Sequence, residues 1–186
     1  MARSLCQITD LSAEDVQDVL TLCGDMKSGK LTPTPLAGKA AACIFTKPSL
    51  RTRVSFEVGI YQLGGSALYI TDNEIKLGER ESVADVARVL SRYVGLIMIR
   101  TFKQSDVEGL ARHASVPVVN GLTDLVHPCQ ILGDYFTVIE HVKKKERYII
   151  AYLGDGNNIT NSWLNLAARL PLDIRVGTDG DCRPDP

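Results

Sequence analysis

The sequence predicts an α/β protein: a parallel sheet flanked by helices, followed by the start of a second α/β domain. Short apolar runs with the length of buried strands alternate with segments whose apolar residues recur at helical spacing. Strands separated by helices favour a parallel sheet with helices on both faces. The alternation restarts after the lysines at 143–145, which suit the C-terminal end of a helix. We therefore expect two domains, over residues 1–143 and 147–186.

The expected first domain opens with a helix over 11–26, because Asp10 or Ser12 can cap apolar residues at helical spacing. A buried strand follows at 39–45. The next helix, 51–63, ends at two glycines, and a strand is expected at 67–70. The apolar faces expected for the two helices consist of Val16, Val19, Leu20 and Cys23, and of Val54, Val58 and Tyr61.

The alternation continues with a helix over 82–93, a strand over 94–100, a helix over 105–113, a strand over 116–120 and a long helix over 127–143. The apolar positions of the first and last of these helices are Val83, Val86, Ala87 and Leu90, and Ile131, Tyr135, Val138 and Val142.

The expected second domain contains a strand over 148–153, a turn over 154–157, a helix over 159–170 and a strand over 172–176. One face of so small a sheet stays uncovered, and the fragment cannot bury enough apolar surface alone. We therefore expect either a truncated domain or one that packs on the first domain or on a partner.

Composition argues against several classes of protein. Basic and acidic residues number 21 and 22, and the net charge of −1 disfavours nucleic-acid binding. No apolar run approaches the roughly 20 residues of a membrane helix, and the first ten residues do not resemble a secretory signal. The five cysteines are scattered without a CxxC pair or a Cys/His cluster, so we expect no metal site, reduced thiols and a cytoplasmic location.

A first candidate site lies at the start of the expected helix 51–63. Its sequence is Lys47-Pro48-Ser49-Leu50-Arg51-Thr52-Arg53. A helix N-terminus presents free N–H groups and partial positive charge, Ser49 and Thr52 add hydroxyl groups, and Arg51 adds a guanidinium suited to phosphate. The same residues also fit a serine-capped helix with two solvated arginines.

A second candidate site is His127-Pro128-Cys129-Gln130, at the start of another helix. His127 and Gln130 share one face of the first turn, where a neutral imidazole can donate to a carbonyl oxygen and an amide oxygen can accept from an NH₂ group. The alternative is a histidine that serves as a cap or a core residue. We expect Cys129 to face away and to pack.

Two further signals are weaker. Arg100 ends the strand 94–100 at the edge where α/β sheets bind ligands, although simple surface exposure would also place an arginine there. Gly154-Asp155-Gly156-Asn157-Asn158 resembles the start of a dinucleotide loop. Ile159 replaces the third glycine, which disfavours a nucleotide-binding Rossmann domain.

Taken together, these segments resemble the aspartate/ornithine carbamoyltransferase superfamily, in order and spacing across essentially the whole chain. The segments that carry the resemblance are Ser49 to Glu57, Gly64-Gly65, Glu81 to Leu90, Arg100, Asn120-Gly121-Leu122-Thr123-Asp124 and His127-Pro128-Cys129-Gln130. The resemblance implies transfer of a carbamoyl group from carbamoyl phosphate to an amine, without metal or organic cofactor.

The resemblance also implies roles for individual residues. Ser49, the Leu50 main chain, Arg51 and Thr52 would hold the phosphate; Arg100 and His127 would face the carbonyl oxygen with help from Thr52; and Gln130 would hold the carbamoyl nitrogen. The family is trimeric, and each site borrows a loop from the neighbouring subunit. The corresponding stretch here is 73–80, where Lys76 either reaches a neighbour's phosphate or is a solvated loop lysine.

The implied acceptor is the side-chain amine of ornithine, which would yield citrulline in arginine metabolism. Cys129 and Asn158 favour this branch, in which Asn158 would help to hold the amino acid. Aspartate, putrescine or an acylated ornithine remain alternative acceptors. The family's second domain continues well beyond residue 186, so an isolated carbamoyl-phosphate-binding or assembly domain without turnover is a further alternative.

Overall fold

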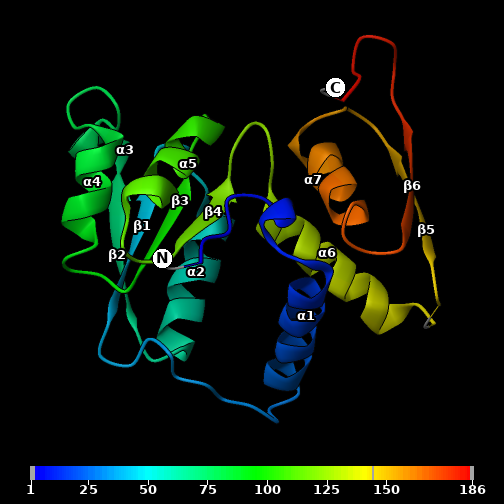
Figure 1. Cartoon of the computed structure of the whole chain (residues 1–186), viewed down its shortest axis with the longest axis horizontal. Helices are drawn as coiled ribbons and strands as arrows, with labels where there is room; N and C mark the ends of the chain where they lie inside the picture. The colour runs from blue at the N-terminus through cyan, green and yellow to red at the C-terminus, as the bar shows by residue number, and fades with distance from the viewer. Residues whose placement is uncertain (1–2, 144, 185–186) are drawn as a thin grey trace.

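The computed structural model describes residues 3–143 and 145–184 and contains a four-stranded parallel sheet (Figure 1). The spatial order of its strands is β2-β1-β3-β4, and each neighbouring pair is parallel. This confirms the predicted fold class. The strands are β1 (Ala40–Phe45), β2 (Ser66–Thr71), β3 (Leu96–Arg100) and β4 (Val118–Leu122).

Helices cover both faces of this sheet, because alternate residues of a strand point to opposite faces. Ala41, Cys43 and Phe45 of β1 pack toward α2, whereas Ala42 and Ile44 pack toward α4 and α5. The helices of this unit are α1 (Ala13–Lys27), α2 (Leu50–Gln62), α3 (Asp72–Ile75), α4 (Val83–Leu90), α5 (Gln104–His113) and α6 (Pro128–His141), preceded by the 3₁₀ turn η1 (Ile8–Asp10).

The strand order creates a switch point at the carboxyl edge of the sheet. From β1 the chain crosses through α2 to β2 on one side, and later returns to β3 on the other side of β1. The connections that leave the ends of β1 and β3 therefore diverge, and ligands of open α/β sheets bind in the crevice that such divergence opens.

The second unit consists of the parallel pair β5 (Tyr148–Leu153) and β6 (Leu172–Gly177) with helix α7 (Asn158–Ala167) between them in the chain. Figure 1 shows it beside α6. Its buried residues, including Trp163 and Leu166, share one core with residues of α1 and α6. The unit thus packs on the first one, as one of the two expectations had it. The outer face of β5 is uncovered, with Ile149 63% and Leu153 84% exposed.

Several local expectations differ from the structure. Helix α3 and η1 were not predicted, and β4 lies two residues later than expected, because Pro117 lacks an N–H and the ladder begins after it. Val54, Val58 and Tyr61 do share one face of α2, but that face is exposed, and Phe56 and Ile60 pack on the sheet instead. The side chains of Cys23 and Val142 are also exposed rather than inward.

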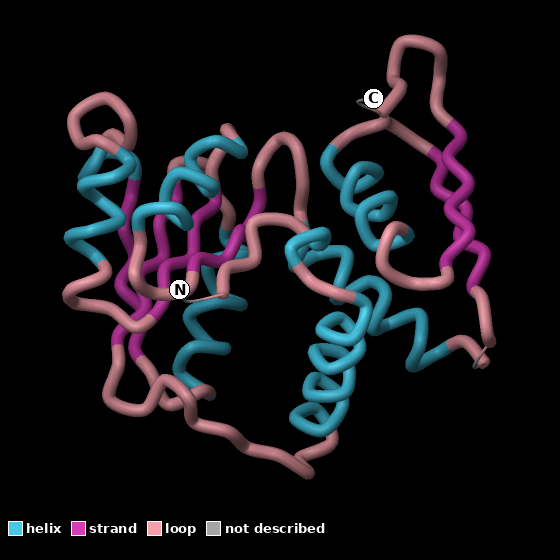
Figure 2. The backbone as a smooth tube through the Cα atoms, in the orientation of Figure 1, coloured by secondary structure: helices cyan, strands magenta, loops and turns pink. Residues whose placement is uncertain are grey.

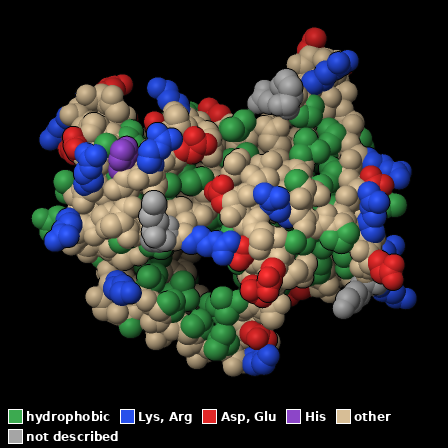
Figure 3. Space-filling view, in the orientation of Figure 1, with side chains coloured by type: hydrophobic (Ala, Val, Ile, Leu, Met, Phe, Trp, Pro, Cys, Tyr) green, Lys and Arg blue, Asp and Glu red, His purple; other side chains and the backbone are tan. Residues whose placement is uncertain are grey.

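Two further features of the described residues concern membrane-spanning helices and the distribution of surface charge. None of the helices in residues 3–143 and 145–184 is both long and apolar enough to cross a membrane. Basic and acidic side chains are interspersed on the face of the molecule in Figure 3, without a broad patch of one sign.

Candidate functional site

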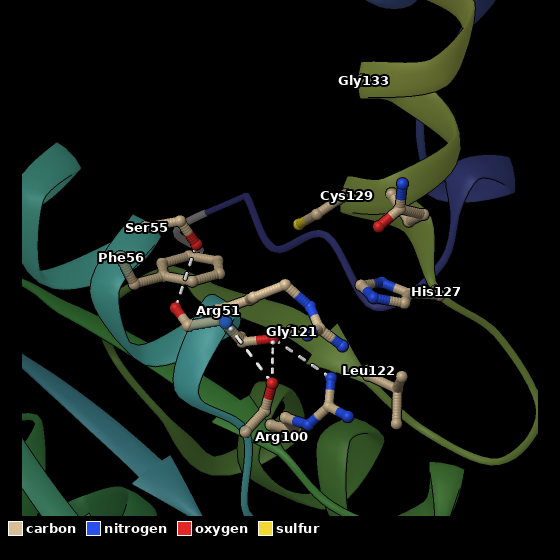
Figure 4. Close-up of a pocket in the computed structure, with 12 residues that line it drawn as sticks. Arg51, Ser55, Phe56, Arg100, Gly121, Leu122, His127, Cys129 and Gly133 are labelled. Atoms are coloured by element: carbon tan, nitrogen blue, oxygen red, sulfur yellow. Dashed lines mark hydrogen bonds between the residues drawn. The ribbon is translucent and has the colours of Figure 1, made fainter.

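A pocket of about 420 Å³ lies at the switch point of the sheet. The side chains of Arg51, Arg100 and His127 converge on one space within it (Figure 4). They come from α2, from the end of β3 and from the residue before α6. The pocket is lined by Ser49, Arg51, Thr52, Ser55, Phe56, Arg100, Gly121, Leu122, His127, Cys129, Gln130 and Gly133.

One wall of the pocket is the beginning of α2. Ser49 caps the helix: its Oγ accepts from the Thr52 N–H (3.4 Å) and donates to Thr52 Oγ1 (3.1 Å). N–H groups in the first turn of a helix lack intrahelical acceptors, so this end attracts anions. Leu50 is in this turn, but its side chain is 77% exposed and does not line the pocket, so only its main chain suits the implied role.

Arg100 connects this wall to the sheet. Its Nη1 donates to Thr52 Oγ1 (3.2 Å), and its carbonyl accepts from the N–H groups of Thr46 (3.0 Å) and Lys47 (3.3 Å). Within the described part of the chain, the buried Arg100 Nε has no hydrogen-bond partner. Burial, and then the charge of Arg51, lower the pKa of Arg100. Because the positive charges of Arg51 and Arg100 repel each other, an anion bound between the two side chains would stabilise both.

A β-bulge lies in β4 opposite the step from Ile99 to Arg100, and it was not predicted from the sequence. Ile99 pairs with Asn120, but Arg100 pairs with Leu122, so Gly121 is the extra residue. A Cβ at Gly121 would lie 2.8 Å from Met98 Sδ and 3.2 Å from the Ile99 carbonyl. Bulges beside functional sites re-aim a side chain, and the glycine inside the strand was the available signal.

The opposite wall begins with His127, which precedes α6 and its first residue, Pro128. Burial, followed by the charge of Arg100, lowers the pKa of His127 to about 4. The imidazole is therefore neutral near pH 7, with one nitrogen able to donate and the other able to accept. Its buried Nδ1 has no hydrogen-bond partner among the residues that the structure describes.

Gln130 and Cys129 complete this wall. Gln130 Nε2 donates to Asp134 Oδ1 (2.8 Å), which leaves its amide oxygen to accept from a ligand. Contrary to expectation, Cys129 lines the pocket, because the first turn of α6 runs along it. Its Sγ donates to the Asn120 carbonyl (3.4 Å), and burial raises the pKa of the thiol to about 11. A protonated, bonded thiol is not a nucleophile at neutral pH.

Asn158 and Lys76 are not brought into this pocket. Asn158 begins α7, and its amide donates to the Thr123 carbonyl (2.7 Å) in the loop before His127. Lys76 is exposed and ends α3 in the left-handed region, with φ 41°, which is unusual for a residue other than glycine.

The chemistry of the pocket follows from its charges. Two guanidinium groups and a helix N-terminus suit a phosphate, while the neutral imidazole and the Gln130 amide suit a neutral carbonyl and its NH₂ group. Within 3–143 and 145–184, no three His, Cys, Asp or Glu side chains are grouped to hold a metal ion. The arrangement can bind a small molecule that joins a phosphate to an amide-like group.

Comparisons with known proteins agree with this geometry. Residues 3–140 match the model of the aspartate/ornithine carbamoyltransferase carbamoyl-P binding domain. The chain is 50% identical over 188 residues to an ornithine carbamoyltransferase of Syntrophus aciditrophicus, covering all of the chain and 62% of that relative.

Solved structures give the same picture. The ornithine carbamoyltransferase of Pyrococcus furiosus superimposes with a TM-score of 0.91 at 42% identity, over 99% of this chain and 60% of that one. The anabolic enzyme of Campylobacter jejuni gives 0.92 at 35% identity, over 100% and 61%. The chain thus spans about three fifths of the length of these relatives. It belongs to the aspartate/ornithine carbamoyltransferase family.

Proposed function

We propose that this chain binds carbamoyl phosphate in the pocket between α2, β3 and α6, as part of an enzyme that carbamoylates the side-chain amine of ornithine. The observation that carries the proposal is the meeting, in one pocket, of a cationic helix N-terminus with a neutral histidine and a carboxamide. A site for phosphate alone requires only the cationic helix N-terminus. The neutral histidine and the carboxamide suit a carbamoyl group.

In the proposed reaction, the neutral amine attacks the carbonyl carbon and forms a C–N bond. The carbonyl carbon becomes tetrahedral and its oxygen becomes an oxyanion. The carbonyl then re-forms as the bond from this carbon to the bridging phosphate oxygen breaks. The proton lost by the amine ends on the released phosphate, so the products are citrulline and hydrogen phosphate. This chemistry requires positioning and preorganised charge rather than a covalent enzyme intermediate.

The residue roles follow the two walls. Ser49, Arg51, Thr52 and the Leu50 main chain would hold the phosphate, which the capped start of α2 supports. Arg100 and His127 would donate to the developing oxyanion, with Thr52 held beside Arg100 at 3.2 Å. The Gln130 amide oxygen would accept from the carbamoyl NH₂ group. Removing one such oxyanion donor typically costs about 3 kcal/mol in the barrier.

For the acceptor, the proposal rests on the relatives, which are ornithine carbamoyltransferases. We propose that residues 147–186 open the amino-acid-binding domain and that 1–143 form the carbamoyl-phosphate-binding domain. Asn158 would contribute to the acceptor site, since it begins α7 and its amide donates to the loop that leads to His127. Five free cysteines support a reducing, cytoplasmic location.

We also propose a homotrimer in which α2 contacts a second copy. Four apolar residues follow one another along an uncovered face of this helix, which starts at the pocket. Exposed apolar stripes of this kind mark association surfaces. Lys76, exposed at the end of α3, would then approach a neighbouring pocket. The four residues and their exposed fractions are Leu50 (77%), Val54 (48%), Val58 (47%) and Tyr61 (77%).

The test of function is calorimetric titration with carbamoyl phosphate and then ornithine, with citrulline assayed in the same sample. We expect saturable carbamoyl phosphate binding; a folded, trimeric sample that does not bind it contradicts the proposal. Binding without citrulline would favour the second candidate, a non-catalytic binding domain.

Sedimentation of the wild type and of Tyr61→Asp tests the proposed trimer. We expect the wild type to sediment as a trimer and the variant to dissociate.

A further inference from the structure

One face of α7 holds the loop that joins β4 to α6, residues 123–127. In Figure 2 this loop rises next to the start of α7. The three contacting side chains are at positions i, i+3 and i+4 of the helix, which share a face. The hydrogen bonds join Asn158 Nδ2 to the Thr123 carbonyl (2.7 Å), Asn161 Nδ2 to the Leu125 carbonyl (3.0 Å) and the His127 N–H to Ser162 Oγ (2.7 Å).

Ser162 is suited to orient this loop. Its side chain is fully buried, and its hydroxyl donates to the Asn158 carbonyl (2.7 Å). Because that donation fixes the proton, a lone pair of Oγ is left to accept from the His127 N–H. Without Ser162, a partly buried N–H group would lose its acceptor, which is unfavourable in a region with little water.

The orientation of the His127 side chain depends on a main-chain contact, whereas Thr52 and Arg100 are oriented by their own side-chain contacts. Thr52 and Arg100 are linked to each other through their side chains, whereas the buried Nδ1 of His127 has no partner in the described chain. The direction of the imidazole is therefore set by the His127 backbone, with φ −135° and ψ 72°, between the loop and Pro128. Ser162 holds that backbone from a helix 35 residues further along the chain.

We propose that Ser162 is a positioning residue, which aims the His127 imidazole into the pocket by accepting the His127 N–H. The inference rests on the proposed function for its consequence, which is recognition of the carbamoyl carbonyl. It assigns the first helix of the second unit a part in the site of the first unit, although Ser162 itself does not line the pocket.

The experiment compares wild type, Ser162→Ala and a matched control, Thr160→Val, by NMR of histidine-labelled protein. Thr160 is an equally buried hydroxyl residue of α7, but its Oγ1 donates to the Asp155 carbonyl (3.0 Å) and not to the loop. The readouts are the pH titration of the His127 imidazole, the His127 amide signal and the affinity for carbamoyl phosphate.

In Ser162→Ala we expect the midpoint of the His127 titration to rise from about 4 by at least ~1 pH unit toward 6.5, because the ring gains access to water. Carbamoyl phosphate should bind about tenfold more weakly, since displaced groups lose alignment. Thr160→Val should lower thermal stability while leaving both values at those of the wild type. If Ser162 had only a structural role, both variants would lose thermal stability, and neither would change the His127 titration midpoint or the affinity for carbamoyl phosphate.

An unchanged His127 titration and amide signal in Ser162→Ala would overturn the inference. Hydrogen exchange in the wild type tests the same contact without a substitution: the His127 amide should be protected, and exchange at the rate of a free amide would also overturn it. Because these signals are read without ligand, a wild type that does not bind carbamoyl phosphate would contradict the proposed function separately.

Discussion

The two walls of the pocket are built in different ways. The α2 wall consists of consecutive residues, in which Ser49 caps the helix and Thr52 contacts both Ser49 and Arg100. The α6 wall presents His127, whose main chain is held by Ser162, far away in the sequence. The first wall forms as soon as its helix forms, whereas the second depends on docking of the second unit. The α2 wall can therefore form from local sequence, while the position of His127 depends on tertiary structure.

The largest expected effect breaks the α2 wall. Arg51→Ala should abolish measurable binding of carbamoyl phosphate, a loss of about 3 kcal/mol or more, because a charge-assisted contact to phosphate disappears. The matched control is Arg53→Ala. Arg53 pairs with Glu57 (2.9 Å) and stacks on Tyr69 (3.8 Å) outside the pocket, so its loss should leave the affinity near that of the wild type. Near-normal binding by Arg51→Ala in calorimetry would remove the basis of the assignment.

The second effect concerns the α6 wall and its dependence on pH. The pKa of His127 is about 4 in the folded chain and 6.5 when unfolded, so the unfolded state binds more protons between these values. Stability should therefore fall as the pH drops from 6.5 to 4. The full difference corresponds to ~3 kcal/mol, which solvent at this half-buried site reduces to about 2 kcal/mol.

Urea denaturation of wild type and His127→Gln across this pH range measures the contribution of His127. The variant should lose the part of the pH dependence that this histidine causes, whereas His113→Gln, at the exposed end of α5, should retain it. Equal slopes in wild type and His127→Gln would show that the imidazole is not buried in its neutral form.

The junction between the walls is the bulge at Gly121, and a matched pair of substitutions tests it. Gly121→Ala should destabilise the fold by about 1–2 kcal/mol and weaken carbamoyl phosphate binding, because its Cβ meets Met98 and the Ile99 carbonyl. Gly59→Ala, in α2 with open space around it, should stabilise the fold by ~0.5–1 kcal/mol. Thermal unfolding of both variants measures these effects. Equal shifts of the unfolding temperature would argue against the close approach of Gly121 to Met98 and Ile99.

The smallest expected effect is on a bridge between the walls. Lys47, which precedes α2, pairs with Asp124 of the loop before His127 at 2.7 Å and lies over the Phe102 ring at 5.0 Å. A double-mutant cycle with Lys47→Met and Asp124→Asn should give a coupling free energy of about 0.5 kcal/mol, since both side chains are partly exposed. A coupling of zero would mean that the walls are joined only through the protein core.

The same contrast explains how much could be predicted from the sequence. The parallel sheet and the cradle at Ser49, Arg51 and Thr52 depend on periodicity and on adjacent residues, so local patterns indicated them. The bulge at Gly121 and the contact between Ser162 and His127 depend on which strands and helices become neighbours. The same holds for the exposed face of α2, because helical spacing identifies an apolar face but not what covers it.

Parallel calorimetric titration of the wild type with carbamoyl phosphate and with inorganic phosphate tests the central claim most directly. In the proposed site, inorganic phosphate would use only the α2 wall and Arg100, whereas carbamoyl phosphate would also use His127 and Gln130, which line the same pocket. We predict that the two ligands compete for one site and that carbamoyl phosphate binds at least about tenfold more tightly, the equivalent of one added hydrogen bond. Equal affinities would mean that the α6 wall does not recognise the carbamoyl group, and would contradict the account.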